Sequence, residues 1–360
     1  MLDHTPKAHG YSLFKVKGTL LLQLLVASCV LHGVSAADPS PRLASKVLGQ
    51  GGRGLVTFRM KAAVDHLFCG VMTSGARVEV QHAVMDAWCS RCSQCVFFSN
   101  ATASGQPVEK LSSGALVVNL QTPGDNGYQR VGYLGYHAEK ARRMQLWTAA
   151  HAPGFAWYLN ADDDTFICME NLLHFLQMST KQIAVGDGHH LGQVSPTGAS
   201  RQQELGWRFL GHRLLHTRKR PRIKGQKAVF HSGGAGYVFS AATLLAAVHG
   251  YTRGPCSKWP LPLKEASDIG IADCLNALGI VAEDTRDSHG RERFHLFNFS
   301  VMRALNATTQ TPASWFSWMT FGYKAGTAGM SRRTISYHYV NAAAMQGYES
   351  HCYVTHGAHE

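Results

Sequence analysis

Charged residues are scarce in this 360-residue chain, and acidic residues are scarcer than basic ones. Only 16% of residues are charged, with 23 Asp and Glu against 35 Lys and Arg, so the formal net charge is +12. The excess could suit a nucleic acid, a membrane surface or an anionic substrate. No recognised nucleic-acid motif accompanies it, so no nucleic-acid partner is expected. With 45% hydrophobic residues, the composition suits a globular protein with a real core.

A zinc-type pairing of cysteines is also missing. The run "CSRCSQC", Cys89 to Cys95, has metal-like spacing, but no second Cys or His pair follows at zinc-finger distance. The nine cysteines are therefore interpreted first as disulfide candidates in an oxidising compartment. The sequence shows no internal repeat.

The hydrophobic run at residues 18–37 is barely long enough to cross a membrane, which takes about 20 apolar residues. "VSA" at 34–36 also fits signal cleavage, so the run is either a signal-anchor or a signal peptide. Lys15 and Lys17 favour a cytoplasmic tail, residues 1–17, if the run is retained. Either alternative sends the rest of the chain into the secretory pathway. Three glycosylation sequons agree with that compartment, at Asn100, Asn298 and Asn306.

Residues 38–63 contain Pro39, Pro41 and "GQGGRG", which predict a flexible stem. After it, strand-like apolar runs alternate with helical apolar spacing. The predicted strands are residues 66–74, 95–100, 115–120 and 155–160, and the predicted helices are 77–88 and 135–151, the second with a basic face. The alternation predicts an α/β domain over residues 64–360, with a mostly parallel sheet covered on both faces.

Three consecutive aspartates, Asp162, Asp163 and Asp164, follow the predicted strand 155–160. Ligands of such sheets bind outside the carboxyl ends of the strands, and carboxylate oxygens favour Mg²⁺ or Mn²⁺. A site for a cation is one interpretation. An acidic turn that caps the following helix is the alternative.

Two further stretches are unusual in composition. "FHSGGAGYVFSAATLLAAV" predicts a small-residue turn followed by a helix, and Gly233, Gly234 and Gly236 would let the backbone approach a ligand closely. Residues 212–227 are rich in Lys and Arg and contain no acid, which also fits a solvated loop.

Six short motifs occur in one order along the chain: "FCGVMT", "WxxRC", "WYLxADDDT", "SGGAGYV", "DxRDxxGRxRF" and "SYHYV". Over roughly residues 66–349 the set resembles the Fringe-like β1,3-glycosyltransferase family, and within it the branch that adds galactose to O-linked GalNAc. The resemblance implies a GT-A-type, Rossmann-like domain and an inverting transfer from UDP-galactose with Mn²⁺. It also implies an O-GalNAc glycoprotein acceptor and a single-pass type II protein of the Golgi or another secretory-pathway membrane, with a luminal catalytic domain.

The resemblance also implies roles for particular residues. Asp162, Asp164 and His338 would hold the metal, although His338 alone would be interpreted as a packed or surface histidine. Asp162 would in addition contact the nucleotide. The other expected donor-binding residues are Thr73, Lys140, Asp163, Gly233, Gly234 and Gly236. Disulfides are implied between Cys69 and Cys92 and between Cys256 and Cys274, whereas Cys89 and Cys95 have no clear match.

Asp268 matches the family's general base, since a carboxylate suits removal of the acceptor proton. Its alternative role is a helix N-cap, because Ser267 and Asp268 open an apolar helix. Trp315 and Trp318 would either stack on an acceptor sugar or pack in the core.

Several positions depart from the family pattern and keep other functions open. Ser267 stands where a glutamate is expected, and the other departures are Ala272, Ala87, His82, the absence of a cysteine pair before "SYHYV" and an insertion near 186–207. The alternatives are a Fringe-type transfer of GlcNAc to O-fucose and a non-catalytic, chaperone- or lectin-like relative. The intact metal ligands argue against the non-catalytic alternative. A homodimer is a further open expectation.

Overall fold

The computed structural model describes residues 66–74, 77–122, 136–185, 206–216, 228–261, 266–305, 318–321 and 324–356. All of them belong to one compact unit, Met60–Glu360. The predicted tail, hydrophobic run and stem lie outside the described residues, as do Trp315 and positions 186–205 of the insertion.

A seven-stranded sheet forms the centre of the fold, in the order β3-β4-β2-β1-β5-β10-β7. The strands are β1 (Leu67–Met72), β2 (Gln94–Ser99), β3 (Val108–Lys110), β4 (Leu116–Asn119), β5 (Trp157–Asp162), β7 (Phe209–Gly211) and β10 (Tyr237–Ser240). All run in one direction except β3 and β10, which pair antiparallel with their neighbours. The predicted α/β fold with a mostly parallel sheet is confirmed.

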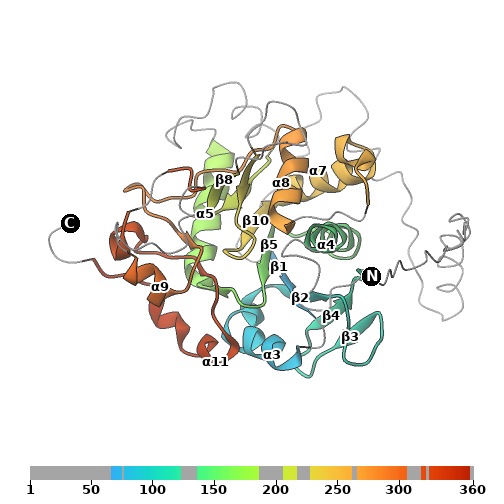
Figure 1. The fold of residues 1–360 in the computed structure, drawn as a ribbon, viewed down its shortest axis with the longest axis horizontal. Coiled ribbons are helices and arrows are strands. Elements are labelled where there is room, and N and C mark those ends of the chain that lie inside the picture. The colour runs from blue at the N-terminus through green and yellow to red at the C-terminus, as the bar shows by residue number, and fades with distance from the viewer. Residues whose placement is uncertain are drawn as a thin grey trace, which may run out of the picture. The chain divides into compact units, whose positions relative to one another are not determined.

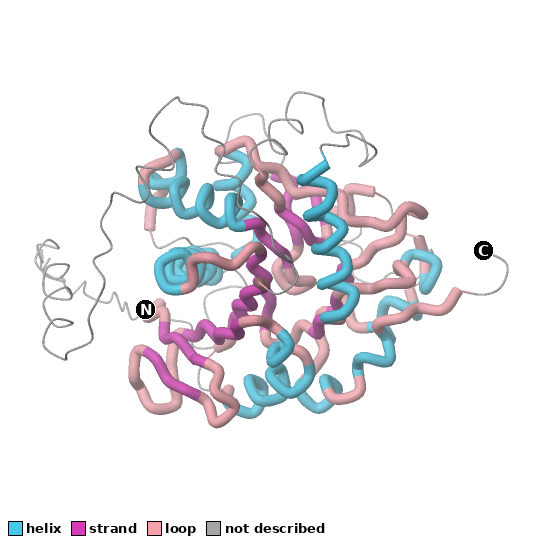
Figure 2. The backbone as a smooth tube through the Cα atoms, turned by 180° about the vertical axis from the view of Figure 1, so that it is seen from behind, coloured by secondary structure: helices cyan, strands magenta, loops and turns pink. Residues whose placement is uncertain are grey.

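Helices cover both faces of this sheet (Figures 1 and 2). α4 (His137–His151), α7 (Ala241–Thr252) and α8 (Ser267–Ala277) contact one another on one side, and α5 (Met169–Val185) lies on the other. α3 (Val78–Ala87) packs against the short helix α11 (Ala342–Met345). The remaining short helices are α9 (Phe299–Ala304), η2 (Cys89–Arg91), η3 (Pro255–Lys258), η4 (Gly326–Gly329) and η5 (Tyr348–His351). Large aromatic side chains fill the space between layers, among them Phe68, Phe97, Trp157 and Phe239, each at most 2% exposed.

Two smaller sheets adjoin the central one. The first has the order β11 (Phe294–His295), β12 (Ser336–Tyr337) and β6 (Phe166–Ile167), and the second pairs β8 (Arg213–His216) with β9 (Ala228–His231). The solvated-loop interpretation is wrong for the start of the basic stretch 212–227. The residues of β8 pair with β9, and Leu214 is fully buried. Residues 217–227 of that stretch lie outside the described part.

Two element boundaries also differ from the sequence prediction. β5 continues through Asp162, because this residue still pairs with Met72 of β1. The glycine turn at 232–236 does not lead directly into a helix. The strand β10 lies between the turn and α7, and its four residues are all buried.

Four disulfides lie in the described residues: Cys69–Cys92, Cys89–Cys95, Cys168–Cys352 and Cys256–Cys274. The first and last are the pairs that the family resemblance implies. Pairing of Cys89 with Cys95 replaces the metal-site alternative for "CSRCSQC". Cys168 joins the start of α5 to the C-terminal segment across 184 residues of sequence.

Replacing both Cys168 and Cys352 by alanine should lower the free energy of unfolding by about 2–5 kcal/mol, because the bridge closes the longest loop of the four. Chemical unfolding of the full chain measures the loss. The matched control removes Cys89 and Cys95, which are only six residues apart. Loop entropy predicts a cost about 3 kcal/mol smaller for that pair. Equal costs for the two double variants would contradict the loop argument.

Two of the three fully buried histidines in the described part of the chain, His231 and His295, predict sensitivity to acid. Burial lowers the pKa of His231 and of His295 to about 3, so both are neutral in the folded protein. An unfolded chain protonates histidine at about 6.5, so this stability is complete above that pH and is lost as the pH falls towards 3. At about pH 5 each of these histidines should lower the free energy of unfolding by about 2 kcal/mol relative to neutral pH.

The His295→Gln variant isolates this effect, because glutamine can still bond to the hydroxyl of Thr334, which lies 3.1 Å from Nε2 of His295. Between about pH 7 and 5, its unfolding free energy should fall by about 2 kcal/mol less than that of the wild type. Parallel pH dependence of the two chains would show that His295 is not buried in its neutral form.

Candidate functional site

The three aspartates lie in a tight turn at the carboxyl end of β5. The Asp163 N–H donates to the Met72 carbonyl (3.0 Å), and the Thr165 N–H donates to the Asp162 carbonyl (3.1 Å). The Thr165 hydroxyl donates to the Gly234 carbonyl at 2.8 Å, which ties the aspartate turn to the glycine turn. Two of the sequence motifs therefore meet at one edge of the sheet.

Asp163 faces the protein interior. Its carboxylate is 5% exposed and accepts the Thr73 hydroxyl (2.5 Å) and the guanidinium of Arg77 (2.9 Å). The buried Lys140 ammonium donates to the Thr73 carbonyl. Burial raises the pKa of Asp163, and the bonds from Thr73 and Arg77 act in the opposite direction. Hydrogen bonds therefore connect three of the residues expected at the donor site, Asp163, Thr73 and Lys140.

Asp162, Asp164 and His338 converge on the other side of the turn. One ligand atom from each lies within 4.8 Å of the other two, and Nε2 of His338 is 3.3 Å from Oδ1 of Asp164. The side chain of Asp164 is 31% exposed and that of His338 is 14% exposed, so the group is open to a ligand. Burial and the charge of Asp164 raise the pKa of Asp162 to about 7. A cation would relieve this repulsion, and two carboxylates with one imidazole fit Mn²⁺ or Mg²⁺.

Short strands bring His338 to the aspartates. β6 begins two residues after Asp164, and β12 ends one residue before His338. The two strands pair antiparallel, with Tyr337 opposite Phe166. The Val340 N–H then donates to the Asp164 carbonyl at 2.9 Å. This pairing brings Asp164 and His338 together although they are more than 170 positions apart in sequence.

The glycine turn brings this group close to Asp268. Gly234 lies directly against the His338 ring, where a Cβ atom would overlap ring atoms. Its neighbour Gly233 donates its N–H to Oδ2 of Asp268 at 3.0 Å. Gly236 has a φ of +76°, in the left-handed region that glycine adopts without strain. Two adjacent glycines thus contact Asp268 and His338, which joins Asp268 to the three-residue group.

Asp268 lies in the first turn of α8, and the N-cap position is Ala266. The N-cap interpretation is therefore wrong in position, although Oδ1 of Asp268 accepts the Ile269 N–H at 2.8 Å. Burial raises the pKa of Asp268, against hydrogen bonds from the backbone of Gly233 and Ile269. The negative charge of Asp268 also raises the pKa of Asp162, which places the two carboxyl groups within electrostatic reach.

Trp318 is partly buried and packs against the core, and its carbonyl accepts the Leu215 N–H at 2.6 Å. At least part of the Trp318 side chain therefore packs in the core, which was the alternative to stacking on an acceptor sugar. Arg77 was not predicted from the sequence. The repulsion among three aspartates demands a positive partner, but nothing local identifies this arginine as that partner.

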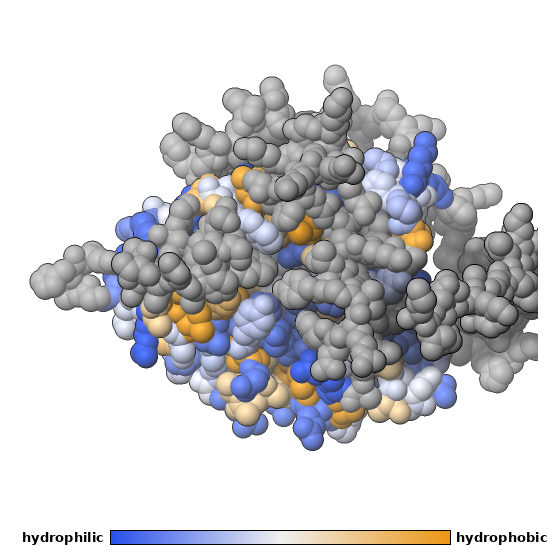
Figure 3. Space-filling model, in the orientation of Figure 1, coloured by the Kyte–Doolittle hydropathy of each residue, from blue (hydrophilic) through white to orange (hydrophobic). Residues whose placement is uncertain are grey.

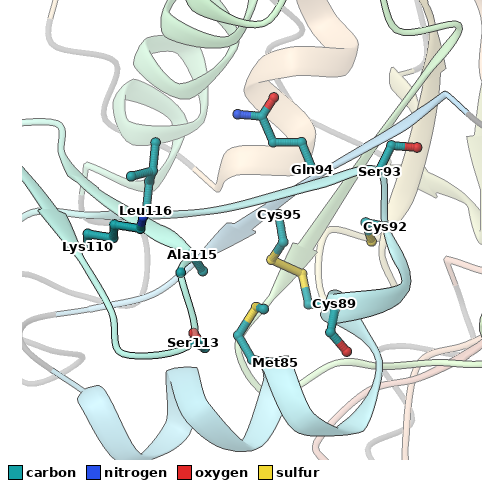
Figure 4. A pocket seen from close by; sticks show the side chains of 12 residues that line it. Met85, Cys89, Cys92, Ser93, Gln94, Cys95, Lys110, Ser113, Ala115 and Leu116 are labelled. Carbon is teal, nitrogen blue, oxygen red and sulfur yellow. A yellow bond between two sulfur atoms is a disulfide. The ribbon is translucent and has the colours of Figure 1, made fainter.

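A separate cavity of about 450 Å³ lies at the opposite edge of the sheet (Figure 4). Its lining includes Gln94 and Leu116, the first residues of β2 and β4, and the Cys89–Cys95 disulfide. The described surface visible in Figure 3 mixes hydrophilic and hydrophobic residues. Because ligands of parallel sheets bind at the carboxyl ends of the strands, the Asp162–Asp164–His338 group is the stronger candidate site.

Comparison with known proteins agrees with this geometry. Residues 63–350 match the family described as Fringe-like, over four fifths of the chain. The chain belongs to the Fringe-like family. One member that it resembles is "Glycoprotein-N-acetylgalactosamine 3-beta-galactosyltransferase 1" of Xenopus laevis, with 24% identity over 288 residues. The matched region covers 80% of this chain and 66% of that relative, slightly less than two thirds of its length.

Membership of the Fringe-like family accounts for the order of the motifs and for the GT-A-like sheet. The family match includes the aspartate turn, the glycine turn, Asp268 and His338. Among the described residues, no helix is both long and apolar enough to cross a membrane. The hydrophobic run at 18–37 lies outside them.

Proposed function

We propose that this protein is a Mn²⁺-dependent, inverting β1,3-glycosyltransferase that moves galactose from UDP-galactose to the 3-hydroxyl of GalNAc on Ser or Thr. The observation that carries the proposal is the Asp162–Asp164–His338 group at the carboxyl edge of the sheet, which the glycine turn joins to Asp268. Family membership and the Xenopus relative's name support the reaction class.

The donor half of the site belongs to the aspartate turn. Asp162, Asp164 and His338 would hold the cation, which when bound neutralises the diphosphate and stabilises UDP as a leaving group. Asp163 orders Thr73 and Arg77 beside it. Gly233 and Gly234 would line the junction between donor and acceptor, where Gly233 contacts Asp268 and Gly234 contacts the His338 ring.

The acceptor half depends on Asp268. Its carboxylate would take the proton of the acceptor hydroxyl while that oxygen bonds to the anomeric carbon and the bond from this carbon to UDP breaks. The raised pKa of Asp268 makes this carboxylate a stronger base than an exposed aspartate. The N–H of Gly233 would keep Oδ2 in place during the transfer. Acceptor contacts from Trp315 and Trp318 remain part of the proposal.

The proposed location is the lumen of the Golgi or of another secretory-pathway compartment, with residues 1–17 as tail, 18–37 as signal-anchor or signal peptide and 38–63 as stem. The four disulfides support an oxidising compartment, because cytosolic proteins rarely keep such bonds.

A donor-by-acceptor screen of the full-length chain tests the proposal. UDP-galactose and UDP-GlcNAc are each offered with a GalNAc-threonine peptide or an O-fucosyl peptide, in Mn²⁺ or in EDTA. Transfer of galactose to the GalNAc peptide in Mn²⁺ alone is expected. Transfer of GlcNAc to the fucosyl peptide would assign the Fringe-type reaction instead. Binding without any transfer would favour a non-catalytic relative, consistent with Ser267 at the expected glutamate position.

A further inference from the structure

The side chains of two consecutive residues, His338 and Tyr339, stack on each other. Their ring centroids are 3.7 Å apart, with an angle of 22° between the planes. In extended backbone, neighbouring side chains point to opposite sides, so such a stack requires the chain to turn. Tyr339 makes that turn with a φ of +57°, a left-handed conformation that bulky side chains rarely adopt. The strained backbone and the ring stack are therefore one feature.

The second face of the His338 ring rests on Gly234. A Cβ atom built on Gly234 would overlap three atoms of the imidazole, so the glycine backbone lies directly over the ring. The Tyr339 ring centroid lies only 3.7 Å from that of His338, so no room is left between the two rings for the Gly234 backbone. The imidazole is therefore held between Gly234 on one face and Tyr339 on the other.

Hydrogen bonds and packing keep Tyr339 in this conformation. Its carbonyl accepts Nδ2 of Asn298 at 3.3 Å, and the next residue, Val340, donates its N–H to the Asp164 carbonyl. The Phe297 ring lies 6.0 Å from the Tyr339 ring and is nearly parallel to it, at 24°. Tyr339 itself stays 47% exposed, so its own burial does little to offset the strain. Strain kept at an exposed position beside a ligand group is typical of functional sites.

We propose that Tyr339 is a positioning residue that clamps the His338 imidazole against Gly234, with Nε2 turned towards Asp164, ready for a divalent cation. The inference rests on the metal site of the proposed function. A clamped ring loses little freedom when it binds a metal, so the clamp raises metal affinity without touching the metal. The same clamp explains why position 234 must be glycine.

Three variants of the full-length chain separate the ring from the backbone turn. Tyr339→Phe keeps the stacking ring and should bind Mn²⁺ within about twofold of the wild type. Tyr339→Asn tolerates the left-handed conformation but removes the ring, and it should weaken Mn²⁺ binding about 10-fold or more, the usual effect of removing a group that orients a metal ligand. Gly234→Ala, which displaces the imidazole, should weaken it at least as much. Free Mn²⁺ is measured by electron paramagnetic resonance, without any substrate.

The thermal unfolding midpoint shows whether each variant is folded, and Tyr339→Asn should match or exceed the wild type because it relieves backbone strain. Wild-type Mn²⁺ affinity in Tyr339→Asn would overturn the clamp. A variant that keeps wild-type Mn²⁺ affinity but shows a raised KM for a GalNAc peptide would also overturn it, because Tyr339 would then act on the acceptor and not on His338. A wild-type chain that binds no Mn²⁺ would overturn both the clamp and the proposed function. Loss of Mn²⁺ affinity in Tyr339→Asn, in a chain that transfers no sugar, would sustain the clamp and overturn the transferase proposal.

Discussion

The Asp164→Ala variant should lose UDP binding and sugar transfer together. Asp164 supplies a partly exposed oxygen 3.3 Å from Nε2 of His338, so its removal leaves the cation with one carboxylate and one imidazole. A bound cation would supply several kcal/mol of charge stabilisation to a departing diphosphate, so transfer should fall about 10³-fold or more. Calorimetric titration of UDP in Mn²⁺ and in EDTA measures the binding half of the effect.

Asp163→Asn is the matched control, since it changes the neighbouring carboxylate, which faces Thr73 and Arg77 and not the metal ligands. Its Mn²⁺ affinity should stay close to that of the wild type. Stability should fall, because the buried Asp163 side chain loses the charge that pairs with the partly exposed Arg77 guanidinium. If Asp163→Asn lost Mn²⁺ and Asp164→Ala kept it, the assignment of the ligands within the triplet would be wrong. Full wild-type activity in EDTA would remove the metal from the account altogether.

The Asp268→Asn variant should keep UDP and Mn²⁺ affinity and lose about 10²–10⁴-fold in transfer rate, the usual cost of removing a general base. Asparagine has nearly the same size, and its single amide oxygen can still accept the Gly233 N–H, so the glycine turn should stay in place although the bond from the Ile269 N–H is lost. Turnover and UDP affinity are measured on the same preparation.

A purely structural role in the first turn of α8 predicts a different outcome for Asp268→Asn, because asparagine can still accept a hydrogen bond from the backbone there. Transfer would then remain near the wild-type rate, and the base would have to lie elsewhere. Glu265, outside the described residues, is the next carboxylate to test. A variant that loses UDP affinity along with transfer would mean that Asp268 acts through the donor site.

The parts of the fold with strong local patterns were predictable from the sequence. The apolar run at 155–160 predicted β5, and the position of Asp162 after it predicted the ligand edge of the sheet. Ordered motifs placed His338 and Asp268 at the same site although they are 70 residues apart in sequence. The role of each residue at that site remains a prediction.

Other features depend on distances that no local pattern encodes. β6 and β12 have two residues each, too short to give a periodicity, yet their pairing brings His338 to Asp164. The partner of Cys168 is 184 positions away, and only the fold brings it near. The positive φ of Tyr339 accompanies contacts with Asn298 and Phe297, which are distant in sequence, so the proposed clamp on His338 could not be predicted from "SYHYV" alone.

The product of one reaction tests the central claim most directly. The full-length chain is incubated with UDP-galactose, Mn²⁺ and a GalNAc-threonine peptide, and the isolated glycopeptide is analysed by nuclear magnetic resonance. The account predicts a galactose joined in the β configuration to the 3-hydroxyl of GalNAc, formed in Mn²⁺ and not in EDTA. An unmodified peptide, or a sugar joined in the α configuration, would contradict it.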